Sequence, residues 1–137
     1  MLGRKDYTRE EHDHAHAAVD AQLAAYRQLA AMVPGASDVA LAFETALFDN
    51  MVLVLDRYFV HRLRVVTGRD CNPLNEVELL ADSLMNNGGV LRAGNVVKWV
   101  PAKTVLGLAV GDPIRLTADD FERLAAAFFA ELEAKFL

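Results

Sequence analysis

The sequence predicts a predominantly helical α+β domain, with four helices in a bundle-like arrangement and a small β-hairpin before the last helix. Three observations support this prediction. Apolar residues recur at helical spacing over most of the 137 residues. Start and stop signals of four helices can be recognised. Strands do not alternate with helices, which argues against an α/β sheet fold. One core usually serves about 100 to 150 residues, so we expect a single domain over 1–137, with residues 1–7 flexible.

The first helix is predicted to begin after Thr8 and to run to about Met32. Thr8 and Glu11 form the pattern of a capping box, in which each side chain satisfies a backbone N–H group at the helix start. The segment Val33-Pro34-Gly35 ends the helix, because proline removes a hydrogen-bond donor and restricts the residue before it.

The second helix is predicted to be the longest, from its cap at Ser37 to Thr67, because the next glycine or proline is Gly68. At ~1.5 Å per residue this helix would be ~45 Å long, against a diameter of roughly 35 to 40 Å for a compact chain. We expect the first helix to lie antiparallel to it. A second subunit would then cover apolar residues left over on the long helix, such as Leu53 and Val60, and the sequence therefore predicts a homodimer.

Asn72-Pro73 is typical of an N-cap followed by the first residue of a helix, and it opens the third predicted helix. One face of this helix is apolar, and the segment 86–89 ends it. Val-rich pieces at 96–100 and 105–110, set among glycines and prolines, predict the two strands of the β-hairpin. The apolar residues of the helix face are Leu74, Val77, Ala81 and Leu84.

Thr117 and Asp120 predict the start of the last helix, with an acidic first turn. Four apolar residues at helical spacing follow and predict its buried stripe. They are Phe121, Leu124, Phe128 and Leu132.

The net charge of −5 argues against a domain wrapped in nucleic acid or lying on an anionic membrane. A single cysteine, Cys71, can form neither an internal disulfide nor a thiolate metal cage, which fits a reducing compartment. The first residues lack the apolar run of a secretory signal, and no segment reaches the ~20 apolar residues of a membrane span. We therefore expect a cytoplasmic protein. Its Ala-rich, Cys-poor composition would suit a bacterium.

His12 and His16 are the candidate metal ligands. They lie one turn apart on the inward face of the first helix, and two imidazoles at this spacing can chelate a divalent metal. Two further ligands would have to come from other helices, where Glu44, Asp49 and Asp56 are available. In the alternative interpretation the histidines contact the end of the core. No other cofactor is predicted.

A second candidate site lies on the long helix. Asn50, Arg57, His61 and Arg64 fall within about 60° of one another if that helix is continuous. Arginine offers a permanent forked donor for an anion such as phosphate, and histidine can transfer a proton near neutral pH. In the alternative interpretation Asp49 or Asp56 neutralises the arginines in a salt-bridge ladder.

The pair Arg57 and His61 resembles the arginine and histidine of HEPN-type metal-independent RNases. Those proteins are small helical dimers with the active site at the dimer seam. The resemblance implies RNA cleavage by Arg57 and His61 between two subunits. Three residues separate the pair here, whereas four to six do so in the family's usual pattern.

The function that these observations predict is a cytoplasmic, homo-oligomeric interaction or regulatory module rather than an enzyme. One alternative is a metal-independent RNase or a nucleotide- or phosphate-binding protein that uses Arg57 and His61, with Arg64 and Asn50 holding the anion. Another is a metal-binding helical bundle that uses His12 and His16.

Overall fold

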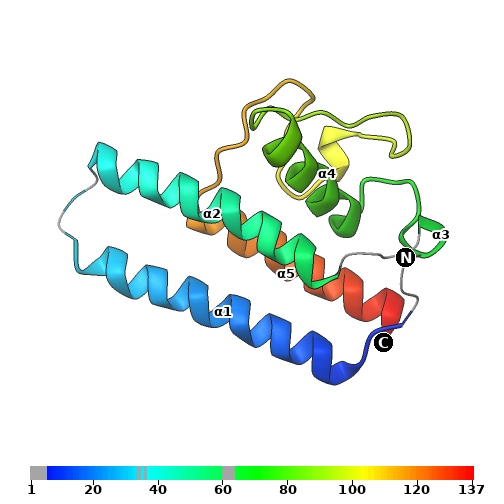
Figure 1. Ribbon diagram of the computed structural model, residues 1–137, viewed down its shortest axis with the longest axis horizontal. Coiled ribbons are helices and arrows are strands. Elements are labelled where there is room, and N and C mark those ends of the chain that lie inside the picture. Colours follow the sequence, from blue (N-terminus) through cyan, green and yellow to red (C-terminus); the bar gives the residue numbers. More distant parts are fainter. Residues whose placement is uncertain (1–5, 34, 36, 60–63) are drawn as a thin grey trace.

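The computed structural model describes residues 6–33, 35, 37–59 and 64–137. Figure 1 shows the first two long helices running antiparallel, with the last helix between and behind them. A shorter helix lies on the side of this group that faces away from the first helix. No described helix combines the length and the apolar character that crossing a bilayer requires. The helices are α1 (Arg9–Ala31), α2 (Asp38–Tyr58), α3 (Arg64–Thr67), α4 (Pro73–Asn86) and α5 (Ala118–Phe136), with a 3-10 turn η1 (Pro101–Lys103) before α5.

The four predicted helix starts are confirmed. In each case a side-chain oxygen accepts a hydrogen bond from a backbone N–H group in the first turn, which satisfies a donor that the helix itself leaves unpaired. At α5 the arrangement is a complete capping box, because the Asp120 carboxylate also accepts from the N–H of Thr117. The capping residues are Thr8, Ser37, Asn72 and Thr117.

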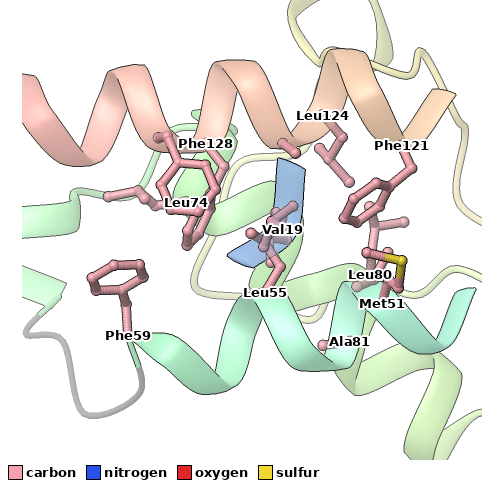
Figure 2. Close-up of a cluster of buried hydrophobic side chains, with 14 of the residues drawn as sticks. Val19, Met51, Leu55, Phe59, Leu74, Leu80, Ala81, Phe121, Leu124 and Phe128 are labelled. Carbon is pink, nitrogen blue, oxygen red and sulfur yellow. The ribbon is translucent and has the colours of Figure 1, made fainter. Parts of the chain in front are cut away.

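Helix α5 is the centre of the core. Its predicted apolar stripe is fully buried, and Phe129 and Ala125 are buried beside it, so α5 meets neighbours on more than one side. Figure 2 shows side chains from four helices meeting there, including Val19 of α1, Leu55 of α2 and Leu74 of α4. Burial of this apolar surface is the main favourable contribution to folding.

The directions of the helices follow from their contacts with α5. Arg9 and Arg27, at the two ends of α1, form ion pairs with Glu133 (3.1 Å) and Asp119 (2.9 Å), so α1 runs antiparallel to α5. Phe48 of α2 and Phe59, directly after α2, contact Phe121 and Phe128 in the same order, so α2 runs parallel to α5. Helices α1 and α2 are antiparallel as predicted, but α1 packs chiefly along α5 rather than along α2.

The prediction of one unbroken helix from 38 to 67 is wrong. Helix α2 ends at Tyr58, and Phe59 leaves the helical conformation with φ −129° and ψ 38°. The Phe59 ring is buried in the core, where its centroid lies 4.9 Å from that of Tyr7 and 5.6 Å from that of Phe128. Phe59 follows the buried Leu55 by four residues, so it keeps the side of the bundle that helical spacing assigns to it. The chain contains neither glycine nor proline at this break, so no local stop signal marks it.

The predicted β-hairpin is also wrong, because none of the described residues belongs to a strand; two isolated bridges, Asp70–Lys98 and Val90–Pro113, are present instead. The N–H groups of Val105 and Leu106 donate to the Glu76 carboxylate at 2.8 and 3.0 Å, so they are not available to a ladder. The N–H of Lys98 donates to the carbonyl of Arg69. Both Val-rich pieces thus bond to other parts of the chain, and the fold is a helical bundle.

Buried polar side chains of α4 hold this irregular region. Asn75 donates to the carbonyl oxygens of Gly68 (3.1 Å) and Asp70 (2.7 Å), and Glu76 holds the loop at 105–106. Ser83 exchanges two hydrogen bonds with the backbone of Arg92. Each buried polar group is thereby satisfied, as the interior of a protein requires.

Replacing Asn75 by alanine should lower the free energy of unfolding by about 1 to 3 kcal/mol, because partly buried carbonyl oxygens lose their donor. Urea denaturation measures this change. The exposed residue Asn95 gives the matched control, and Asn95→Ala should change the free energy by less than about 0.5 kcal/mol. Equal effects of the two substitutions would show that the network does not stabilise the fold.

Candidate functional site

An apolar cleft lies where the end of α1 faces the start of α2. Its volume is about 560 Å³, and its walls come from both helices, with Tyr26 and Leu29 on one side and Val39 and Phe43 on the other. Six large apolar side chains in or beside the cleft are exposed, by 47% to 80% of their surface. We call these six residues the α1–α2 tip. They are Leu29, Met32, Val33, Val39, Leu41 and Phe43.

The tip is exposed because α5 starts too late in the chain to cover it. The start of α5 lies beside Arg27 of α1 and Glu44 of α2. The Arg27 guanidinium pairs with the Asp119 carboxylate at 2.9 Å, and the Glu44 carboxylate accepts a hydrogen bond from the N–H of Ala118 at 2.9 Å. Helix α1 continues beyond Arg27, and α2 begins before Glu44. The last turns of α1 and the first turns of α2 therefore project beyond the N-terminal start of α5.

Aromatic contacts mark the base of the cleft. The Tyr26 ring stacks on Phe43 with centroids 6.4 Å apart and meets the edge of the buried Phe48 at 4.9 Å. Desolvation by burial, followed by the nearby Glu44 carboxylate, raises the pKa of Tyr26. Tyr26 is therefore neutral at pH 7, and Glu44 is the one residue of the described lining that carries a charge there.

The structure brings His12 and His16 together on α1, with ring centroids 5.8 Å apart. His12 is buried, and its Nε2 lies 3.2 Å from the carbonyl oxygen of Phe129, which can only accept; its Nδ1 faces the Asp13 carboxylate at 2.9 Å. His16 stacks on Phe129 at 4.5 Å. In the described part of the chain, no three potential ligands gather as a metal site requires. The contacts favour the interpretation in which both histidines pack at the end of the core.

Two of the three carboxylates considered as metal ligands accept hydrogen bonds from the backbone near the start of α5. Glu44 and Asp49 of α2 accept hydrogen bonds from the N–H groups of Ala118 and Leu116, so they fasten the start of α5 to α2. Burial raises the pKa of Asp49, and the bond from Leu116 partly offsets this effect. Asp56 lies at the edge of a different hollow, between α2 and α4.

The predicted row of Asn50, Arg57, His61 and Arg64 loses its geometric basis, because one continuous helix no longer carries it. Asn50 and Arg57 lie on the exposed side of α2. His61 lies outside the described residues, as does Val60. Arg64 begins a separate helix, and its side chain is outside the described part. RNA cleavage or phosphate binding at this row stays a prediction.

Sequence reasoning missed Asn75, Glu76 and the α1–α2 tip. A signal for the first two was present, since these polar residues stand between Leu74 and Val77, two residues of the predicted apolar face. The tip could not be found in this way, because its exposure depends on where the start of α5 lies relative to α1 and α2. Comparison of the chain with protein-family models, curated proteins and solved structures finds no match.

The stability of the fold should depend on pH through Glu76. Desolvation by burial raises the pKa of Glu76 above its ordinary value of 4.5, against the opposing effect of the bonds from Val105 and Leu106. The folded chain then holds this proton more tightly than the unfolded chain does. The contribution of Glu76 to the free energy of unfolding therefore falls as pH rises from 4.5 through the folded-state pKa, and is constant above it.

Urea denaturation of the wild type and of Glu76→Gln between pH 4.5 and 8 tests this expectation, because glutamine does not titrate and the other groups cancel in the difference. The wild type should gain stability relative to Glu76→Gln as pH is lowered from 7 to 4.5. A difference that is independent of pH, or that changes in the opposite direction, would contradict the assignment.

Proposed function

We propose that this chain is a homo-oligomeric interaction module whose copies associate through the α1–α2 tip. The observation that carries the proposal is the gathering of six exposed apolar side chains around one cleft. Contiguous apolar patches of this kind are typical of protein-protein contact sites. The single cysteine, which is buried and unpaired, supports a reducing compartment such as the cytoplasm.

The extent of the tip suits a dimer interface. Six such side chains, exposed by about half or more, present on the order of 500 Å² of apolar surface. A standard interface takes about 800 Å² from each partner, so the tip with a polar rim around it reaches the required size. The cleft between the helices offers a hollow for side chains that project from a second copy.

The charge distribution favours a second copy over an oppositely charged partner. The whole chain carries a net charge of −5, so most faces of two copies repel each other. At the tip the one charged residue of the lining is Glu44, whose carboxylate already accepts a hydrogen bond from the backbone of Ala118. Two tips can therefore meet with little like-charge repulsion.

A two-fold arrangement follows from these features. In such an interface the same surface patch serves on both subunits, and each contact occurs twice. Phe43 of one copy would then enter the cleft of the other, where Tyr26 and Leu29 supply apolar walls. Leu53, the seam residue that the sequence suggested, instead packs partly against the core of its own chain.

Replacing Val39 by glutamate should convert the dimer to a monomer. Val39 is 80% exposed, so the substitution leaves the core intact, whereas it would place a carboxylate in the apolar interface. The dimer dissociation constant should rise by at least about 100-fold. Sedimentation velocity over a concentration series measures it, and circular dichroism checks that the fold is unchanged.

Val110 provides the matched control, because it is 59% exposed and lies outside the tip. Val110→Glu should leave the dissociation constant at the wild-type value. A wild type that sediments as a monomer at all concentrations up to about 1 mM would overturn the proposal, since that limit corresponds to a binding free energy of only about −4 kcal/mol. An unchanged dimer in Val39→Glu would exclude the tip as the seam.

A further inference from the structure

A second hollow lies far from the tip, at the loop that follows α3. Its volume is about 350 Å³, and its lining includes three basic residues, Arg69, Lys98 and Lys103. Cys71 and Val100 form part of the wall between them, and the Cys71 thiol donates to the Val100 carbonyl oxygen at 3.5 Å. The hollow therefore combines cationic groups with an uncharged surface.

The backbone that carries the three cations is held in place by hydrogen bonds. The residues 70 and 98 form a parallel bridge, and the N–H of Lys98 donates to the carbonyl of Arg69 at 2.7 Å. The buried amide of Asn75 donates to the carbonyl of Asp70. At Lys103 the backbone is fixed by the 3-10 turn η1. Residues far apart in the sequence thus meet at one place in a defined geometry.

The charges in this hollow lack internal compensation. Five basic residues elsewhere form ion pairs with carboxylates, namely Arg9, Arg27, Arg92, Arg123 and Lys135, whereas Arg57 and Arg115 form none in the part of the chain that the structure describes. Within the described residues, no ion pair engages Arg69, Lys98 or Lys103.

Asp70 is the one acid of the lining, and its Oδ1 accepts from the side-chain amide of Asn72 at 3.0 Å. The hollow thus has a net charge of +2 in a chain of net charge −5. A bound anion would relieve the mutual repulsion of the three cations.

We propose that this hollow binds the phosphate group of a small organic molecule. A phosphate monoester carries up to two negative charges, which match the net charge of the hollow, and arginine and lysine are the side chains that bind it best. The wall formed by Cys71 and Val100 would contact the organic part. The net negative charge of the chain disfavours a nucleic-acid polymer, which requires a more extended cationic surface than one small hollow.

Titration with inorganic phosphate, at an ionic strength held constant with chloride, tests the proposal. In two-dimensional ¹H–¹⁵N NMR spectra, the amide signals of residues 69–71, 98 and 103 should shift and saturate. Phenyl phosphate should bind more tightly than inorganic phosphate, because its ring can contact the uncharged wall. Signals that do not saturate, or that respond equally to chloride, would overturn the proposal. Equal affinity for the two phosphates would overturn the inference that the uncharged wall contacts the organic part of the ligand.

Arg69→Gln should weaken phosphate binding by about tenfold or more, because it removes a charge-assisted hydrogen-bond donor. Arg115→Gln is the matched control, since Arg115 is also exposed and lies outside the hollow, and it should bind as the wild type does. Equal affinity in both variants would overturn the assignment. Both residues lie outside the α1–α2 tip, so the result is independent of the oligomeric state.

Discussion

The structure depends above all on the burial of α5. This helix presents apolar side chains to α1, α2 and α4 together, so it connects α1 to the pair formed by α2 and α4, which also pack against each other. Two carboxylates of α2, Glu44 and Asp49, bind N–H groups at the start of α5 and set its position along the bundle. Because α5 begins at Ala118, there is no helix to cover the ends of α1 and α2 that extend beyond it. The exposed tip is thus a direct consequence of where the central helix starts.

The irregular half of the chain depends on a different kind of interaction. In the loop before α4 and in the segment between α4 and α5, the backbone forms neither a long helix nor a sheet. Its polar groups therefore need other partners. Side chains of α4 supply them: Asn75 binds the loop after α3, Glu76 binds the loop after η1, and Ser83 binds Arg92. Burial of these polar groups is tolerated because each is hydrogen-bonded. The same contacts hold the basic residues around their hollow.

The burial of α5 and the hydrogen bonds of α4 leave two exposed surfaces, one apolar and one cationic. The α1–α2 tip is apolar and nearly uncharged, whereas the hollow that includes Arg69, Lys98 and Lys103 is cationic. Figure 1 shows the end of α1 and the start of α2 at one end of the molecule and α3, which precedes Arg69, toward the other. A partner at the tip would therefore leave the hollow accessible. This separation would let one chain combine the proposed self-association with the proposed recognition of a small anion.

The sequence by itself determined the local features. Caps at Thr8, Ser37, Asn72 and Thr117 identify helix starts because they act within four residues, and the stripe on α5 follows from helical periodicity alone. The tertiary structure decided what local signals do not contain. It ended α2 at Tyr58, where neither glycine nor proline signals a helix end, and it directed the N–H groups of Val105 and Leu106 to Glu76 rather than to a neighbouring strand. Which apolar and charged residues remain exposed was likewise decided by packing between distant segments, because exposure is a property of the assembled surface.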